Sequence, residues 1–122
     1  MIKIWVDDER PMPEGYTPEG YDYWCKSVFD AIELLAAFNF RDDDKGIVLD
    51  LDHDAGEYRR LGGDYIKILE WMEYSGNRRK ELYGSAANAM PAPIKVHFHS
   101  ANPVGVKNMR AIVENCPWME EV

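Results

Sequence analysis

Three short apolar runs, each followed by acidic or histidine residues, constrain the fold of this chain most strongly. They are residues 2–6, followed by Asp7 and Asp8; residues 47–51, followed by Asp52, His53 and Asp54; and residues 94–98, followed by His99. Short apolar runs of this kind are typical of strands in a buried parallel sheet. Ligands of open parallel sheets bind beyond the carboxyl ends of the strands, so we expect the three clusters to converge on one pocket. This arrangement favours a site for a metal and a phosphate.

Helical patterns separate the predicted strands. The expected helices begin at Ser27, with an apolar face through residue 38; at Asp64, as N-cap, with an apolar stripe that stops at Gly76; and at Asn102, followed by Pro103. Residues 21–25 are aromatic enough for an edge strand, whereas Pro and Gly recur too often in residues 11–21 for a helix. A long connection is expected over residues 77–93, with a helical part at 79–83. The alternation predicts an α/β fold with a parallel sheet of about four strands and no fifth strand.

Length and composition limit the classes of protein to consider. The 122 residues are 46% hydrophobic, which suits one domain over residues 1–122. The net charge of -8 argues against an extended nucleic-acid-binding face, because such faces gather Lys and Arg. No apolar run has membrane-spanning length, and the first residues lack a signal-peptide core. We therefore expect a cytoplasmic protein that does not associate with a membrane. Cys25 and Cys116 are expected to be reduced and partly buried.

Carboxylates at two strand ends form a candidate metal site. Asp7 and Asp8 follow the first strand, and Asp52 follows the strand at residues 47–51. Mg²⁺ and Mn²⁺ prefer hard oxygen ligands of this kind, so one of these ions is the expected cofactor. An acidic turn that binds nothing is the alternative. Period-two alternation places Asp50 on the same face as Asp52, where we expect a buried structural carboxylate rather than a catalytic group.

Two histidines beside these carboxylates are candidates for moving protons. His53 lies between two acidic residues, which suits a proton donor, although a hydrogen bond within its own turn explains it equally well. His97 and His99 alternate onto one face of their strand, and we expect His99 nearer the pocket and His97 in the core. Two histidines at one pocket serve as general base and general acid in phosphodiester cleavage, or they help to bind a metal. The sequence leaves these roles open.

Three further polar residues are candidates for binding a phosphate. Ser100 and Asn102 lie at the start of the last predicted helix, where backbone N–H groups and the helix dipole favour an anion. Arg10 follows the first acidic cluster, and at this position its guanidinium is expected to reach a phosphate. Ordinary helix capping explains Ser100 and Asn102 as well, and surface solvation explains Arg10.

Three motifs resemble those of the cyclic-phosphate processing receiver-like domains, a divergent branch of the response-regulator receiver fold. They are residues 5–11 (Trp-Val-Asp-Asp-Glu-Arg-Pro), 51–56 (Leu-Asp-His-Asp-Ala-Gly) and 99–103 (His-Ser-Ala-Asn-Pro). The resemblance covers nearly the whole chain, with the motifs in the family's order. It implies a flavodoxin-like three-layer sandwich in which a loop replaces the first helix.

In a phospho-accepting receiver, an acidic pair holds Mg²⁺, an aspartate accepts the phosphoryl group, and a Ser or Thr contacts it. The resemblance gives these roles to Asp7 and Asp8, to Asp52, and to Ser100. The expected lack of the first helix, and of a fifth strand with its lysine, argues against ordinary two-component signalling. His53 and His99 are absent from ordinary receivers.

The family name implies processing of cyclic phosphates, such as the 2′,3′-cyclic ends of RNA or nucleotides. The resulting expectation is a metal-dependent phosphoesterase whose partner is a nucleotide or an RNA end, with the oligomeric state left open. A non-catalytic receiver-like module that binds a partner or accepts a phosphoryl group is the alternative. A haloacid-dehalogenase-like phosphatase built on Asp50 and Asp52 fares worse, because little sequence remains for the lysine and acidic pair it needs.

Overall fold

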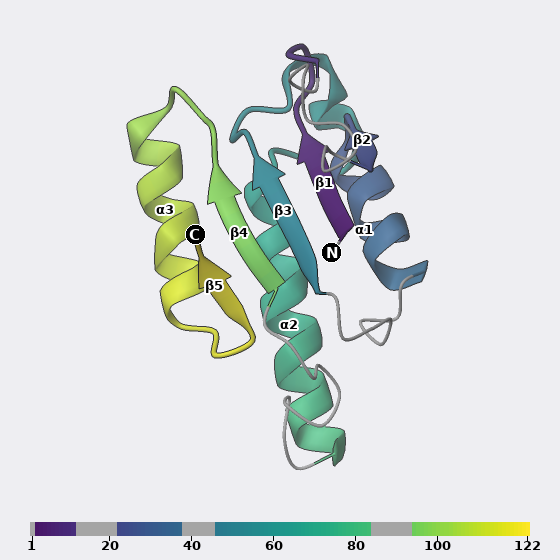
Figure 1. The fold of residues 1–122 in the computed structure, drawn as a ribbon, viewed down its shortest axis with the longest axis vertical. Coiled ribbons are helices and arrows are strands. Elements are labelled where there is room, and N and C mark those ends of the chain that lie inside the picture. Colours follow the sequence, from purple (N-terminus) through teal and green to yellow (C-terminus); the bar gives the residue numbers. More distant parts are fainter. Residues whose placement is uncertain (1, 12–21, 38–45, 84–93) are drawn as a thin grey trace.

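The computed structural model describes residues 2–11, 22–37, 46–83 and 94–122. Five strands within these ranges form one parallel sheet (Figure 1). Its strands are β1 (Ile2–Val6), β2 (Tyr23–Cys25), β3 (Ile47–Leu51), β4 (Ile94–Phe98) and β5 (Met119–Glu121). The helices are α1 (Val28–Ala37), α2 (Ile66–Tyr83) and α3 (Pro103–Glu114), with a short 3₁₀ helix, η1 (Gly56–Leu61). The strand order β2-β1-β3-β4-β5 is the flavodoxin-like order. The predicted receiver-type α/β fold is therefore confirmed.

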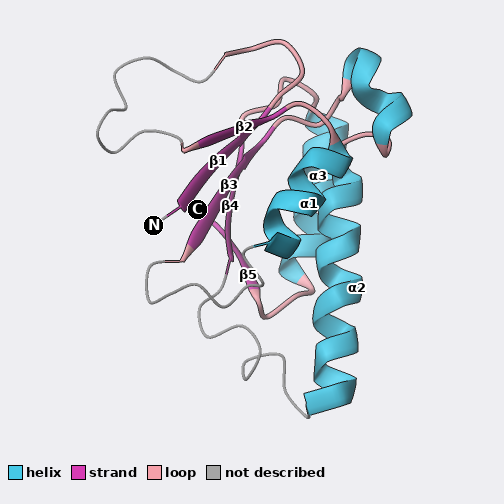
Figure 2. Cartoon of the chain, turned by 90° about the vertical axis from the view of Figure 1, so that its right-hand side faces the viewer, coloured by secondary structure: helices cyan, strands magenta, loops and turns pink. Residues whose placement is uncertain are grey.

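All three α-helices lie on one face of the sheet (Figure 2). Each of them connects a strand to the next one in the same direction across the sheet, and right-handed crossovers in one direction put their helices on one side. Of the three layers expected, the described residues therefore form two. The loop expected to replace the first helix falls mainly on residues 12–21, outside the described residues.

The fifth strand is a correction to the expectation of about four strands. Met119 pairs with Ile94, so β5 lies beside the start of β4 rather than beside its carboxyl end. Only Met119 of its three residues is buried. A three-residue edge strand that ends in two glutamates has no apolar period, which is why the sequence did not predict it.

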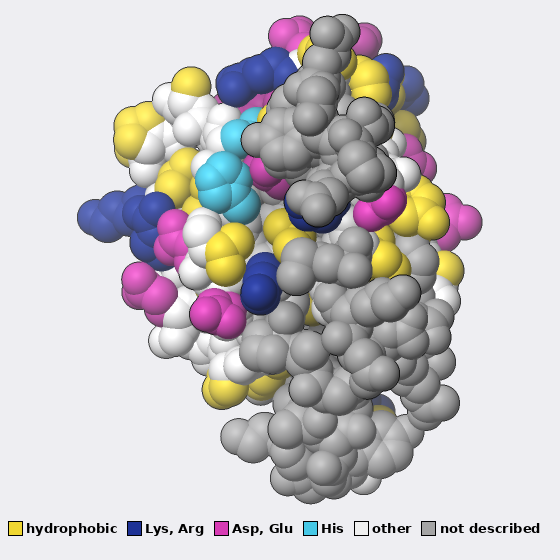
Figure 3. All heavy atoms as spheres, in the orientation of Figure 1, with side chains coloured by type: hydrophobic (Ala, Val, Ile, Leu, Met, Phe, Trp, Pro, Cys, Tyr) yellow, Lys and Arg dark blue, Asp and Glu magenta, His cyan; other side chains and the backbone are white. Residues whose placement is uncertain are grey.

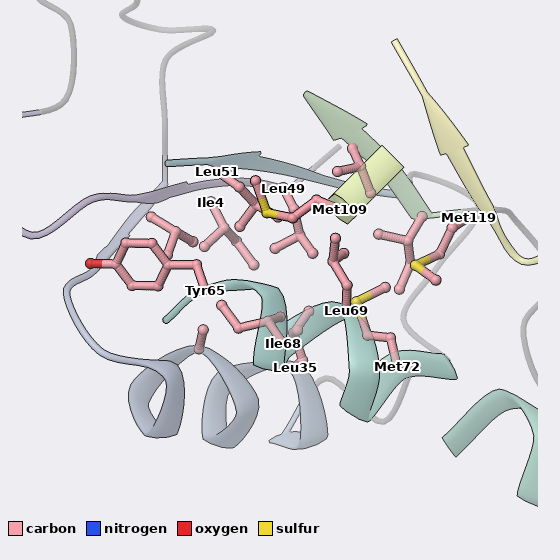
Figure 4. Packing of buried hydrophobic residues seen from close by; sticks show 14 of the residues in the cluster. Ile4, Leu35, Leu49, Leu51, Tyr65, Ile68, Leu69, Met72, Met109 and Met119 are labelled. Atoms are coloured by element: carbon pink, nitrogen blue, oxygen red, sulfur yellow. The ribbon is translucent and has the colours of Figure 1, made fainter. Parts of the chain in front are cut away.

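The core lies between the sheet and the helices (Figure 4). Strands β1, β3 and β4 contribute Ile4, Val6, Leu49, Leu51 and Val96, and the helices contribute Leu35, Ile68, Leu69, Met72, Met109 and Val113. Burying a side chain of this size stabilises the fold by about 1.5–3 kcal/mol. The apolar faces predicted for the helices are therefore confirmed within the described residues, and residue 38, expected on the face of the first helix, lies outside them. Cys25 and Cys116 are both free and buried, and burial raises the pKa of each thiol to about 11.

Helix α2 continues past Gly76, where the apolar stripe was expected to stop. Gly76 packs directly against the indole ring of Trp118, whose Nε1 atom donates to the carbonyl oxygen of Met72 at 3.1 Å. The glycine therefore makes room for a side chain from outside the helix instead of ending it. The helical expectation for residues 79–83 is confirmed, and residues 84–93 of the long connection lie outside the described residues. None of the described helices is long and apolar enough to span a membrane.

Two of the three residues expected to begin the helices accept a hydrogen bond from the first helical turn, as predicted. Ser27 Oγ accepts from the backbone N–H of Asp30 at 3.1 Å, and Asn102 Oδ1 accepts from that of Gly105 at 2.9 Å. Asp64 does not cap α2 as expected. Its Oδ1 atom instead accepts from the backbone N–H of Ala55 at 3.0 Å, which ties the segment after β3 to the start of α2.

The sheet face opposite the helices presents a polar row. Asp50 lies beside Trp5 on β1 and beside His97 on β4 in the strand register. Because neighbouring residues alternate between faces, these three side chains point away from the apolar core of Leu49 and Leu51. Trp5 and Asp50 are nevertheless buried. This row leads to the carboxyl ends of β1, β3 and β4.

Candidate functional site

His99 is held between two buried carboxylates at the carboxyl edge of the sheet. Its Nε2 atom lies 2.9 Å from Oδ2 of Asp7, and its Nδ1 atom lies 2.6 Å from Oδ1 of Asp50. The side chain of His99 is 10% exposed, and those of Asp7 and Asp50 are 1% and 6% exposed. The imidazole also stacks on the indole of Trp5, with ring centroids 3.8 Å apart and planes 4° apart. Two carboxylates and the indole of Trp5 therefore hold the His99 ring in one orientation.

Asp7 is fixed by the turn that follows β1. Its Oδ1 atom accepts from the backbone N–H groups of Glu9, at 2.9 Å, and Arg10, at 2.7 Å. The Arg10 guanidinium donates to the carbonyl oxygen of His99 at 3.1 Å and lies 3.8 Å from Oδ2 of Asp7. Arg10 therefore links the ends of β1 and β4 and places a positive charge at the rim of the site.

Asp52 completes the group. Its backbone N–H donates to the carbonyl oxygen of Val6, and its Oδ1 atom accepts from the N–H of His53 at 2.7 Å. One ligand atom each from Asp7, Asp52 and His99 lies within 4.8 Å of the other two. Two carboxylate oxygens and one imidazole nitrogen, all on buried or partly buried side chains, are a donor set that suits a divalent cation such as Mn²⁺ or Mg²⁺. We name Asp7, Asp52 and His99 the metal group.

Asp8 is adjacent to the metal group but is not part of it among the described residues. Its carboxylate lies directly against Gly56, which has a φ of 55° and no side chain to displace it. Burial raises the pKa of the Asp8 carboxyl, and the charges of Asp7, Glu9 and Asp52 raise it further. Asp8 was expected to be a third metal ligand, and this stays a prediction.

The carboxylates of the site also act on Tyr65. The pKa of the Tyr65 phenol is raised, first by burial and then by the charges of Asp8, Asp7 and Asp52. The phenol is fully buried and donates to the carbonyl oxygen of Lys26 at 2.7 Å, so it acts as a neutral anchor. A phosphate approaching this edge meets several carboxylates, and a bound cation would offset their repulsion.

His53 belongs to a second group, on the side of the sheet that faces α3. Its Nδ1 atom lies 2.9 Å from Oδ1 of Asp54 and 3.4 Å from Nδ2 of Asn102. The ring packs directly against Gly105 in the first turn of α3. The His53 contact and the Asn102 amide both lower the pKa of the Asp54 carboxyl. Asp52 and His53 thus point to opposite faces, as the alternation predicted.

A ligand atom each from His53, Asp54 and Asp64 also lies within 4.8 Å of the other two. This second set suits a cation less well than the metal group does. Asp64 Oδ1 already accepts from the Arg59 guanidinium at 3.2 Å as well as from a backbone N–H. The positive charge of Arg59 therefore already lies beside that carboxylate, where it opposes a metal ion.

The residues expected to bind phosphate have clear structural contacts. Asn102 caps α3, and Ser100 Oγ accepts from the N–H of Asn102 at 3.1 Å. Their role as helix-start residues is therefore seen directly. Both lie between His99 and the first turn of α3, so they connect the two groups. Whether Arg10, Ser100 and Asn102 also bind a phosphate stays a prediction.

Two contributors to the site were missed in the sequence. Asp50 is buried, as expected, but its contacts with His99 and His97, which the sequence did not predict, place it beside the metal group. His97 was expected in the core, yet its side chain is 50% exposed, on the sheet face opposite the helices. Figure 3 shows histidine side chains on this face, next to acidic and basic ones. The period-two alternation of Trp5, Asp50 and His97 was the available signal.

Comparison with known proteins gives one match. The model of the cyclic-phosphate processing receiver domain matches residues 2–115, a span from β1 to the end of α3 that includes both groups described above. No protein with a curated description and no solved structure matches the chain. The chain belongs to the family of cyclic-phosphate processing receiver domains.

Proposed function

We propose that this domain is a metal-dependent phosphoesterase that opens cyclic phosphates, such as the 2′,3′-cyclic ends of RNA or nucleotides. The observation that supports this most is the metal group itself. Asp7, Asp52 and His99 offer ligand atoms within 4.8 Å of one another in a family described by cyclic-phosphate processing. The activity has a physical basis in a fixed set of charged side chains at the edge where parallel sheets bind ligands.

A divalent cation, Mg²⁺ or Mn²⁺, would be held by Asp7 and Asp52 with His99 as the third ligand. When bound, it would neutralise the phosphate charge and polarise the phosphorus–oxygen bonds. The protein's own contribution is to fix these side chains before the substrate arrives. Backbone N–H groups hold Asp7 and Asp52, and the stack on Trp5 holds His99. Preorganised groups of this kind lose little free energy to reorganisation during the reaction.

His53 is the proposed proton-transfer group. In ring opening, a water oxygen forms a new bond to phosphorus, and the bond from phosphorus to one ribose oxygen breaks. The water loses a proton to bulk solvent or to a base, and His53 delivers a proton to the leaving ribose oxygen. The contact between His53 Nδ1 and Asp54 supports this role, because it orients the ring and leaves Nε2 as the atom for the substrate.

Arg10, Ser100 and Asn102 are the proposed phosphate-binding residues. The Arg10 side chain is 54% exposed at the rim, where a guanidinium offers paired donors to phosphate oxygens. Ser100 and Asn102 precede α3, whose first backbone N–H groups favour an anion. The proposed partner is therefore a nucleotide or an RNA end rather than an extended nucleic acid, consistent with the net charge of -8.

The test is turnover of adenosine 2′,3′-cyclic phosphate with Mn²⁺, compared between the wild type and Asp52→Asn. We expect Asp52→Asn to lose about 100-fold or more in kcat/KM, together with affinity for Mn²⁺. Asp22→Asn is the matched control, because it removes the charge of an exposed carboxylate that only accepts from the backbone N–H of Lys3 among the contacts of the described residues. Equal turnover by the wild type and Asp52→Asn would remove the proposal.

A receiver-like module without turnover is the second candidate. The strand-end position of Asp52, with Asp7 beside it and Ser100 after β4, favours this reading, because a phospho-accepting receiver has the same arrangement. Stoichiometric labelling of Asp52 by acetyl phosphate, without ring opening, would support it.

Two further expectations stay predictions. One is that residues 1–122 form a single domain, and the other is that the protein is cytoplasmic.

A further inference from the structure

We propose that Asp50 is a positioning residue that acts through His99, by fixing the direction in which the Nε2 atom of His99 points. This inference rests on the proposed function, because it assigns how the third member of the metal group is oriented. Asp50 was expected from its sequence position to be only a buried structural carboxylate. The contacts of its side chain support a more specific role.

Two histidines, His97 and His99, share one carboxylate oxygen of Asp50. Asp50 Oδ1 lies 2.6 Å from Nδ1 of His99 and 3.0 Å from Nδ1 of His97. The first distance is short for a nitrogen–oxygen hydrogen bond, and hydrogen bonds to a carboxylate are stronger than neutral ones. The Asp50 side chain is 6% exposed, so water competes little for this oxygen.

The direction of the His99 ring follows from two constraints. The parallel stack on Trp5 fixes the plane of the ring, but a half-turn about the Cβ–Cγ bond keeps this plane and exchanges the positions of Nδ1 and Cδ2. The contact between Nδ1 and Asp50 selects one of these two orientations. With Nδ1 toward Asp50, the opposite nitrogen faces Asp7, at 2.9 Å from its Oδ2 atom. A metal-binding histidine is generally oriented in this way by a carboxylate on its other nitrogen.

The strand register explains why Asp50 is well placed for this task. Asp50 pairs with His97 across β3 and β4, and the backbone N–H of His99 donates to the carbonyl oxygen of Leu51. The carboxylate and the imidazole therefore come from neighbouring strands held by backbone hydrogen bonds. His97 contacts the same oxygen from the half-exposed side, which makes it the outer support of Asp50.

A purely structural role for Asp50 makes a different prediction. A carboxylate that only fills space would be replaced by asparagine with little effect on the ring, because the two side chains have nearly the same shape. Asparagine lacks the negative charge, however, and its amide nitrogen is a donor. Under the positioning role, Asp50→Asn therefore weakens the hold on His99 even where the fold is unchanged.

The experiment combines a spectroscopic and a kinetic measurement on Asp50→Asn, with Asp22→Asn as the control. The protein has three histidines, so long-range ¹H–¹⁵N spectra resolve their ring nitrogens. We expect the wild type and the control to show a slowly exchanging, downfield Nδ1 proton for His99, and Asp50→Asn to lose it. With adenosine 2′,3′-cyclic phosphate, kcat should fall about 10–100-fold with KM within about twofold. Mn²⁺ affinity should fall by a similar factor.

The outcomes separate this inference from the proposed function. Should the wild type open no cyclic phosphate, the proposed function fails, and the His99 signal together with Mn²⁺ affinity still decides the role of Asp50. Retention of the signal, or its loss with kcat and Mn²⁺ affinity both unchanged, would overturn the positioning role. If Asp50→Asn does not fold, His97→Ala removes the outer support at a half-exposed position and should shift the same quantities in the same direction by a smaller factor. No shift there would overturn the inference.

Discussion

The imidazole ring of His53 lies directly against the α-carbon of Gly105, in the first turn of α3. A methyl group on Gly105 would overlap the Cγ and Cδ2 atoms of the ring. The absence of a side chain at Gly105 therefore fixes how closely the loop after β3 approaches α3. The position of His53 depends on this contact as well as on Asp54.

Gly105→Ala is expected to displace the His53 ring. Under the proposed function, turnover should fall while Mn²⁺ affinity stays at the wild-type value, because the added methyl group would meet the His53 ring rather than a member of the metal group. Alanine is favoured over glycine within a helix by about 1 kcal/mol, which offsets part of the steric cost of the added methyl group. Steady-state kinetics and Mn²⁺ titration check this. Lys107→Ala, at an exposed position of the same helix, is the control.

The two candidate histidines should respond differently to substitution. His99→Ala removes a member of the metal group, so both Mn²⁺ affinity and turnover should decrease. His53→Ala removes the proposed proton donor, so kcat should fall by about 10²–10⁴-fold with Mn²⁺ affinity unchanged. Calorimetric Mn²⁺ titration of both variants separates the roles. Loss of Mn²⁺ affinity in His53→Ala, with wild-type affinity in His99→Ala, would reverse the assignment.

Asn102 is expected to contribute to stability as the N-cap of α3. Its Oδ1 atom accepts from the N–H of Gly105 at 2.9 Å, so Asn102→Ala leaves that donor without its cap. The free energy of unfolding should decrease by about 0.5–2 kcal/mol, and Asn102→Ser, which keeps an acceptor and adds no charge beside Asp54, should lose much less. Urea denaturation of the three proteins measures the difference. An equal decrease in the free energy of unfolding in both variants would contradict a stabilising role for the cap.

The pair of Arg110 and Glu121 predicts a small pH-dependent contribution to stability. The guanidinium donates twice to the carboxylate, each at 2.7 Å, and these hydrogen bonds lower the pKa of Glu121. A lowered folded-state pKa gives stability that is present above the unfolded-state pKa and is lost as the pH falls through the folded-state value. Glu121→Gln should therefore have a lower melting temperature than the wild type at neutral pH.

The same comparison at acidic pH supplies the check. The difference in melting temperature between the wild type and Glu121→Gln should shrink as the pH is lowered from about 7 to about 3, because the wild-type carboxylate becomes protonated. Both partners are substantially exposed, so the effect is small and decreases with salt. A difference that grows toward low pH would contradict this account.

The strand ends and helix faces were predictable because they depend on local periodicity. Asp7, Asp52 and His99 follow apolar runs, and parallel strands bring their carboxyl ends to one edge, so their proximity followed from the sequence. The contact of Asp50 with His99 did not follow, because it depends on the register between β3 and β4. Gly76 looked like a helix end because its partner, Trp118, lies 42 positions away in the sequence. Contacts of this kind are set by packing rather than by local pattern.

The separation of His53 from His99 shows the same limit. Alternation placed Asp52 and His53 on opposite faces, which the structure confirms, but the sequence did not show what His53 would meet there. Gly105 is one of nine glycines, and only the packing of α3 against the loop after β3 distinguishes it. His53 and His99 belong to two groups of side chains that Asp52, Ser100 and Asn102 connect, and the sharing of one pocket by both histidines stays a prediction.

The most direct measurement is product analysis after incubation of the wild-type protein with adenosine 2′,3′-cyclic phosphate. The reaction is run with Mn²⁺ or Mg²⁺ and then with excess chelator, and the 2′- and 3′-monophosphates are separated. The account predicts ring opening that needs the metal, stops with chelator, and gives predominantly one isomer, because one proton donor serves one leaving oxygen. Binding of Mn²⁺ without any monophosphate formed would contradict it.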